Sequence, residues 1–228
     1  MTAAERLLAA ARSAEGFMPD EEGLALTRLA RLLAQAGPGE LPQLVVEIGA
    51  YCGRSTLYLA AGLAEGGTRP AEGAARPVVF SVDHHHGSEE NQEGWEHHDP
   101  TLVDPRTGRM DTLARWRGAI GDAGAEDYVV GVVGESAAVA AHWSSPVGLL
   151  FVDGGHGEEP ARADYLGWVP HVALGGLLAI HDVFPDPADG GRPPYELYCR
   201  ALSSKGFEED EELGRGSLRV LRRVSSAY

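Results

Sequence analysis

Polar side chains that can do chemistry follow the apolar runs of this chain at the points where the runs end. Carboxylates at such points could bind ribose hydroxyls or a divalent cation, and a neutral imidazole could act as a base near pH 7. One such position could arise by chance, but the pattern is repeated after five consecutive runs, which indicates one shared ligand site. The residues concerned are Glu47, Asp83, Ser136, Asp153, His156, His181 and Asp182.

Five short apolar runs must position these side chains. Each run is apolar throughout rather than alternating with polar residues, which indicates that both faces of the sheet are covered. Helical stretches separate the runs, and this alternation predicts an α/β fold with a doubly wound, Rossmann-like, mostly parallel sheet. Such sheets bind ligands at the carboxyl ends of their strands, where these side chains would meet. The predicted strands are 44–48, 78–82, 128–133, 147–152 and 176–180, and the predicted helices are about 55–63, 110–120, 135–142 and 159–170.

Three further segments complete the expected organisation. Residues 206–212 and 217–224 predict a hairpin that adds two antiparallel strands to one edge, which gives a seven-stranded sheet. Two helices, at 3–14 and 19–37, precede the first strand, and we expect residues 1–38 to form a helical cap on a domain formed by residues 39–228. Residues 84–109 form a long polar loop after the second strand, at the edge where ligands bind, and are predicted to be a lid.

A glycine-containing turn follows the first predicted strand. Gly49 and Gly53 let the backbone turn tightly and approach a ligand, and the helix that begins near Arg54 offers unpaired N–H groups. The order G-A-Y-C-G differs from GxGxxG, which disfavours an NAD-dependent oxidoreductase. The chain contains no GxxxxGK[ST] motif, which excludes a P-loop NTPase.

Composition narrows the possible partners. The chain has 228 residues and a net charge of −15, so a nucleic-acid backbone or an anionic membrane would repel it. The apolar runs are too short to span a bilayer, and the first residues lack the apolar core of a signal peptide. Cys52 and Cys199 stand alone, without a disulfide framework. We therefore expect a cytoplasmic protein.

The motifs carry a resemblance to a known family. VEIGAYCGRS, followed by an acid at the end of the second strand, resembles the nucleoside-binding signature of class I S-adenosylmethionine-dependent methyltransferases. The string EIGAYCG is similar to catechol-type O-methyltransferases, and LLFVDGGHGEEPARADYLGWVPHVALGGLLAIHDVF resembles bacterial macrolide-sugar and cephalosporin-tailoring methyltransferases. The resemblance covers roughly residues 44–185.

The resemblance implies S-adenosylmethionine as cofactor. Glu47, Gly49 and Tyr51 would line its methionine end, with Ser55 nearby. Asp83 would bind both ribose hydroxyls, and Ser136 would lie beside the adenine. These residues could instead have purely structural roles, Glu47 and Asp83 as caps of backbone turns and Ser136 as a helix N-cap. The full set of expected cofactor contacts is Glu47, Gly49, Ala50, Tyr51, Gly53, Ser55, Asp83, His84, Ser136 and Asp153.

The resemblance also implies catalytic and metal-binding positions. Asp153, His181 and Asp182 match the metal ligands of the metal-dependent relatives. His181 replaces a carboxylate there, and nitrogen is a poorer ligand for Mg²⁺, so a softer divalent ion or no metal at all stays open. His156 occupies the place of the family's lysine base and would accept the acceptor's proton. The expected catalytic residues are thus His156, Asp153 and His181.

These expectations define a function. We expect methyl transfer to a small-molecule acceptor, as O-methylation of a hydroxyl that a divalent metal such as Mg²⁺ could assist, in secondary metabolism. The alternatives are N- or C-methylation, or a non-catalytic partner protein that binds the cofactor. The intact cluster of Asp153, His156, His181 and Asp182 argues against the last. The identity of the acceptor and the assembly of the chain into a homo-oligomer stay open.

Overall fold

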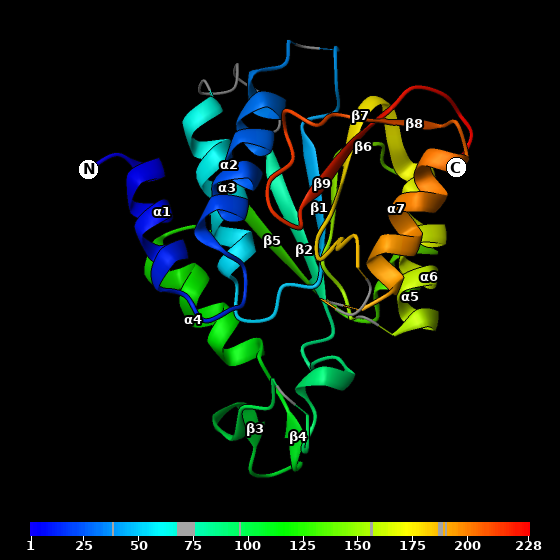
Figure 1. Ribbon diagram of the computed structural model, residues 1–228. Coiled ribbons are helices and arrows are strands. Elements are labelled where there is room, and N and C mark those ends of the chain that lie inside the picture. The colour runs from blue at the N-terminus through cyan, green and yellow to red at the C-terminus, as the bar shows by residue number, and fades with distance from the viewer. Residues whose placement is uncertain (38, 68–75, 96, 156, 187–188, 190) are drawn as a thin grey trace.

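A seven-stranded sheet forms the centre of the protein, with helices on both of its faces (Figure 1). The computed structural model describes residues 1–37, 39–67, 76–95, 97–155, 157–186, 189 and 191–228. The strand order is β5-β2-β1-β6-β7-β9-β8, and the first five strands in this order are parallel. β9 is antiparallel to both β7 and β8, as the predicted hairpin requires. The strands are β1 Leu44–Ile48, β2 Val78–Asp83, β5 Val129–Val133, β6 Val147–Val152, β7 Val172–Ile180, β8 Phe207–Glu209 and β9 Arg219–Arg223.

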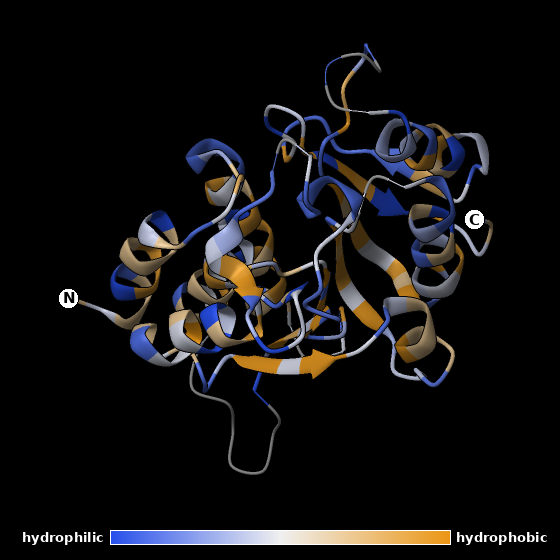
Figure 2. Ribbon diagram, turned by 90° about the horizontal axis from the view of Figure 1, so that it is seen from below, coloured by the Kyte–Doolittle hydropathy of each residue, from blue (hydrophilic) through white to orange (hydrophobic). Residues whose placement is uncertain are grey.

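Each face of the sheet buries its own hydrophobic core. On one face Val45 and Phe151 pack with apolar residues of the N-terminal helices and α3, and on the other Val46 and Leu150 pack with Trp168 of α6. Figure 2 shows apolar strands inside and polar residues on the outer sides of the helices. This arrangement confirms the predicted α/β, mostly parallel fold. The helices of the first face are α1 Ala3–Ser13, α2 Asp20–Gln35, α3 Arg54–Gly66 and α4 Leu113–Ala123, and those of the second are α5 Ser136–Ala140, α6 Glu158–Trp168 and α7 Pro193–Ser203.

The N-terminal helices pack closely on α3. Gly23 of α2 has no room for a side chain, because a Cβ there would lie 2.3 Å from the ring of Tyr58. The hydroxyl of Tyr58 also donates to Asp20 at 2.6 Å. α1 and α2 therefore share one hydrophobic core with the sheet. That residues 1–38 form a distinct cap on the domain of residues 39–228 stays a prediction.

Two segments differ from the expectation. Helix α7 was not predicted from the sequence; two prolines occupy its first turn, and Leu197 and Ala201 form a short buried stripe. The loop 84–109 is more structured than a simple polar loop: it contains the 3₁₀ turns Glu89–Asn91 and Pro100–Leu102 and the strand β3 Val103–Asp104, which pairs with β4 Arg109–Met110. This hairpin lies beyond the carboxyl ends of the strands (Figure 1). Among the described residues, no helix has the length and apolar character that crossing a membrane requires.

Candidate active site

The turn between β1 and α3 brings the backbone close to the end of β6. Gly49 has φ +85°, and a Cβ on it would lie 2.1 Å from the carbonyl oxygen of Asp153. Tyr51 also adopts a left-handed conformation, with φ +47°, which is uncommon for a non-glycine residue. The geometry of the turn therefore depends on glycine and places residues 49–53 directly beside the loop after β6.

Asp83 ties this turn to the loop after β2. Its Oδ2 accepts the backbone N–H groups of Ala50 at 2.8 Å and Tyr51 at 2.9 Å, and its Oδ1 accepts that of His85 at 2.7 Å. The structure thus brings together three of the residues expected around the cofactor. His84, the next residue, accepts the N–H of His86 on Nδ1 at 3.0 Å, and the two rings stack.

Glu47 is completely buried between β1, β2 and α3. Its Oε2 accepts the hydroxyls of Thr56 at 2.6 Å and Ser81 at 2.7 Å. Burial raises the pKa of Glu47 to about 7, and nearby hydroxyls, including that of Ser55, oppose this shift. Since the carboxyl lies on the side of the strand that faces α3, its partners come from the protein interior.

Ser136 begins α5 and contacts two side chains of α6. Its hydroxyl accepts the indole N–H of Trp168 at 2.7 Å, and Asp164 lies beside it. Asp164 is buried, and burial raises its pKa to about 6. Asp164 was not predicted from the sequence, although it lies three residues after Ala161 and one before Tyr165, on the buried stripe of α6.

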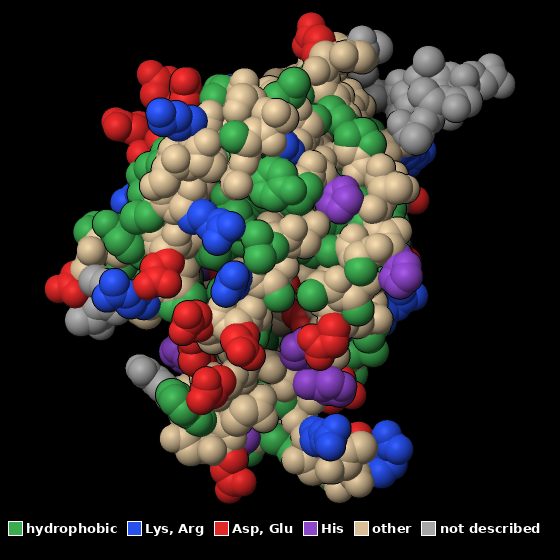
Figure 3. Space-filling model, turned by 90° about the vertical axis from the view of Figure 1, so that its right-hand side faces the viewer, with side chains coloured by type: hydrophobic (Ala, Val, Ile, Leu, Met, Phe, Trp, Pro, Cys, Tyr) green, Lys and Arg blue, Asp and Glu red, His purple; other side chains and the backbone are tan. Residues whose placement is uncertain are grey.

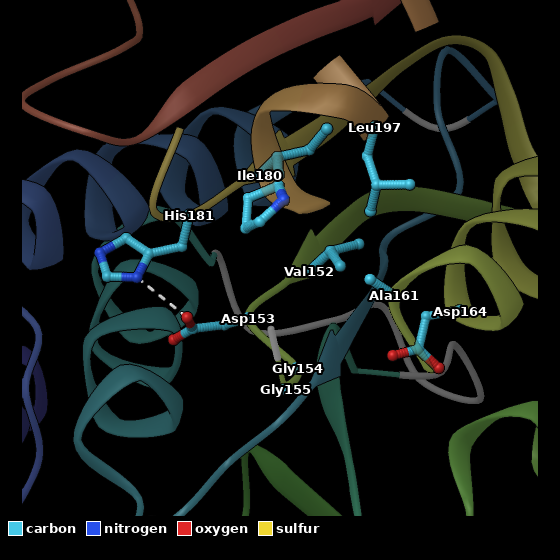
Figure 4. Close-up of a pocket in the computed structure, with 10 residues that line it drawn as sticks. Val152, Asp153, Gly154, Gly155, Ala161, Asp164, Ile180, His181 and Leu197 are labelled. Carbon is cyan, nitrogen blue, oxygen red and sulfur yellow. Dashed lines mark hydrogen bonds and ion pairs between the residues drawn. The ribbon is translucent and has the colours of Figure 1, made fainter. Parts of the chain in front are cut away.

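A small, narrow pocket lies between β6, β7, α6 and α7 (Figure 4). Asp153 and His181 lie at one side of it and the carboxyl group of Asp164 at the other. The wall between them is apolar. The apolar lining residues are Val152, Ala161, Ile180, Pro194 and Leu197.

His181 lies among three carboxylates. Its Nδ1 is 2.9 Å from Oδ1 of Asp153 and 3.3 Å from Oδ2 of Asp182, and its Nε2 is 2.6 Å from Oε2 of Glu22. Burial alone lowers the pKa of His181, but Asp153, Asp182 and Glu22 together raise it well above its ordinary value. Asp182 holds φ +55°, an uncommon backbone conformation of the kind that often occurs at functional sites.

Asp153, His181 and Asp182 form a group that could hold a metal ion. One ligand atom from each residue lies within 4.8 Å of the others. The register between β6 and β7, in which Val152 pairs with Ile180, brings these residues together, because they directly follow the paired strand ends.

A family model described as a methyltransferase domain matches residues 46–183, more than half of the chain. The chain belongs to this methyltransferase family. It is a methyltransferase, as its motifs predicted.

Three solved O-methyltransferase structures share the fold of this methyltransferase. The enzyme from Bacillus cereus, in complex with SAH, is 16% identical with a TM-score of 0.58, over 98% of this chain and 90% of its own. TomG from Streptomyces achromogenes, involved in tomaymycin synthesis and in complex with SAM, is 16% identical with a TM-score of 0.57, over the same shares. NovP is 16% identical with a TM-score of 0.62, over 89% of this chain and 80% of its own.

The site contains two acids that were not predicted from the sequence, Asp164 and Glu22. Glu22, from α2, contacts His181, although its sequence position suggested only an acid in the first turn of a helix. A signal was present, because Glu22 lies on the same stripe as the buried Leu26 and Leu29. His156, the expected base, lies outside the described residues.

The surface around this edge is rich in titratable groups. In the view of Figure 3, acidic and histidine side chains gather in the lower half of the molecule, below the level at which the strands of the large sheet end in Figure 1, with Lys and Arg side chains at the lower right. Such a surface favours cations over anions near the site.

Proposed function

We propose that this methyltransferase transfers the methyl group of S-adenosylmethionine to a hydroxyl oxygen of a small molecule, beside a divalent cation held by Asp153, His181 and Asp182. The observation that carries the proposal is the convergence of these three side chains at the strand ends next to the turn 49–53. The names of the structural neighbours, one of them an enzyme of tomaymycin synthesis, support an oxygen acceptor and a place in secondary metabolism.

The cofactor would lie across the carboxyl ends of β1 and β2. The turn 49–53 and the N-terminus of α3 would receive its methionine end, and Asp83 would receive the ribose hydroxyls. Ser136 would contact the adenine. Two observations support this placement: the left-handed turn lies at the carboxyl end of β1, and the N–H groups of Ala50 and Tyr51 hold the carboxylate of Asp83 directly beside it.

The donor set fits a divalent cation. Two carboxylates and one imidazole are mixed oxygen and nitrogen ligands, which suit Mn²⁺, Fe²⁺ or Zn²⁺ better than Mg²⁺. Counting Glu22, three carboxylates surround one imidazole, so the cluster carries a formal negative charge even when the ring is protonated. A divalent cation would balance this charge.

The proposed reaction is a direct displacement. The O–C bond forms as the methyl–sulfur bond breaks, the sulfur keeps the electron pair, and the acceptor's proton goes to a base. A bound cation would lower the pKa of the acceptor hydroxyl. The chain's own contribution is to hold the oxygen about 3 to 3.5 Å from the methyl carbon and in line with the sulfur. We propose His156 as the base from its place three residues after Asp153.

One observation favours a metal-free variant of the same reaction. His181 contacts carboxylates through both ring nitrogens, so a protonated ring can itself balance part of the charge of Asp153 and Asp182. In that variant Asp153 would accept the hydroxyl proton directly. The two variants differ in their response to chelators.

The test uses S-adenosylmethionine labelled with ¹³C in its methyl group and matched pairs of acceptors that carry either a hydroxyl or an amine on the same aromatic or sugar scaffold. NMR of the products identifies the methylated atom. We expect O–CH₃ products from at least one hydroxylated acceptor. Products methylated only on nitrogen or carbon would contradict the proposal, as would binding of the cofactor without turnover of any acceptor.

A further inference from the structure

We propose that Glu22 positions the imidazole of His181, so that the N-terminal helix α2 contributes a working part of the active site. The inference rests on the proposed metal site, and Glu22 lies outside the matched family region 46–183. Oε2 of Glu22 lies 2.6 Å from Nε2 of His181, and both side chains are almost completely buried, with 5% and 6% of their surfaces exposed.

The other oxygen of Glu22 is held by the turn before β9. Oε1 accepts the backbone N–H of Ser217 at 2.6 Å and its hydroxyl at 3.1 Å. Gly216 makes this approach possible, because a Cβ there would lie 2.0 Å from the same oxygen. The carboxylate is thereby fixed between two segments that are far apart in sequence, and it cannot rotate freely.

This arrangement decides which ring nitrogen of His181 faces the site. Glu22 accepts the proton of Nε2, and Nδ1 is left facing Asp153 and Asp182. A histidine that binds a metal commonly donates its second N–H to a carboxylate, which fixes the tautomer and the ring orientation. Glu22 is the carboxylate that accepts this second N–H of His181, and Nδ1 is the ring nitrogen that would bind the cation.

Glu22→Gln tests the orientation directly. The N–H and hydroxyl of Ser217 need an acceptor, so the amide oxygen would take the place of Oε1 and the NH₂ group would face Nε2 of His181. An NH₂ group cannot accept the Nε2 proton. We therefore expect ¹⁵N-resolved NMR to show a hydrogen-bonded Nε2–H signal for His181 in the unaltered protein and to show its loss in the variant.

Mn²⁺ affinity gives a second readout that does not depend on activity. Titrations followed by electron paramagnetic resonance, without cofactor or acceptor, should show binding about 10- to 100-fold weaker in Glu22→Gln. Glu21→Gln removes the same charge from an exposed neighbour in the same helical turn and should leave Mn²⁺ binding unchanged. Glu22→Asp keeps the charge but is one methylene shorter, so it should also weaken binding and serves if Glu22→Gln does not fold.

The outcomes separate this inference from the proposed function. Retention of the Nε2–H signal in folded Glu22→Gln, or Mn²⁺ affinity in a folded Glu22 variant equal to that of the unaltered protein, would overturn the role of Glu22. If the unaltered protein itself binds no Mn²⁺, the metal site of the proposed function is wrong. The NMR signal then decides by itself whether Glu22 orients the ring.

Discussion

Nδ1 of His181 lies 2.9 Å from Oδ1 of Asp153, and these two residues directly follow the ends of the neighbouring strands β7 and β6. Their proximity follows from the parallel pairing of Val152 with Ile180, which puts the next residue of each strand side by side. The register of the sheet therefore determines the position of these two residues at the centre of the site.

The first prediction concerns Asp153. Asp153→Asn removes one negative charge and one proposed ligand, and we expect Mn²⁺ affinity to fall by more than about 100-fold, beyond the effect of an outer residue such as Glu22. Mn²⁺ titration followed by electron paramagnetic resonance measures it. Asp122→Asn, on the exposed side of α4, makes the same chemical change away from the site and should bind Mn²⁺ normally. Equal affinities in the two variants would remove Asp153 from the ligand set.

We expect Asp83 to contribute to cofactor binding and to the conformation of the turn that it holds. In Asp83→Asn the amide has one acceptor oxygen for the three backbone N–H groups that now bond to the carboxylate. The ribose hydroxyls would also lose a charged acceptor, which costs about 1.5–3 kcal/mol, so S-adenosylmethionine should bind about 10- to 100-fold more weakly. Calorimetric titration checks this, with the exposed Asp127→Asn as control. An unchanged affinity would show that Asp83 serves the loop alone.

Because Glu47 is buried, we expect the free energy of unfolding to depend on pH. Its pKa in the folded protein is about 7, above the ordinary value of 4.5, so the unfolded chain releases this proton first as the pH rises. The protonated carboxyl of Glu47 therefore makes its full contribution to the free energy of unfolding below about pH 4.5. This contribution, on the order of 3 kcal/mol, is lost as the pH rises from about 4.5 to 7. Glu47→Gln should remove this slope. Urea unfolding of both proteins at pH 5 and pH 7.5 measures it, and parallel slopes would contradict the assignment.

Gly49 is predicted to tolerate no side chain. Gly49→Ala combines a left-handed backbone with a Cβ that would lie 2.1 Å from the carbonyl oxygen of Asp153. We expect a loss of about 2 kcal/mol or more in the free energy of unfolding. Gly108→Ala is the matched control, because Gly108 has φ +67° but nothing within 4 Å of its Cβ position, and it should cost only about 1 kcal/mol. Denaturant unfolding curves compare the two, and equal losses would mean that the contact with Asp153 is unimportant.

Much of the architecture could be predicted from the sequence because its signals are local. Continuous apolar runs and the helical stretches between them gave the order of strands and helices, and their ends located Asp83, Asp153, His181 and Asp182. α7 was missed because its buried stripe is short and begins with two prolines.

The buried acids outside the strand ends could not be located in the same way. Glu22 and Asp164 lie on the buried stripes of α2 and α6, but the helical spacing does not show which partner each acid has in the interior. Glu22 meets its partner across 159 residues of sequence, between an N-terminal helix and the end of β7. No local pattern encodes that contact, although an acid on an otherwise apolar stripe of a helix indicates that the acid is buried.

The most direct test of the account is cofactor turnover with a hydroxylated acceptor, measured as SAH formation in EDTA-treated protein before and after addition of Mn²⁺. The proposed site at Asp153, His181 and Asp182 predicts little turnover in EDTA and full recovery with Mn²⁺, with no recovery in Asp153→Asn. Turnover that is equally fast in EDTA and Mn²⁺ would contradict a metal-assisted reaction and leave the charged His181 cluster as the site that prepares the acceptor.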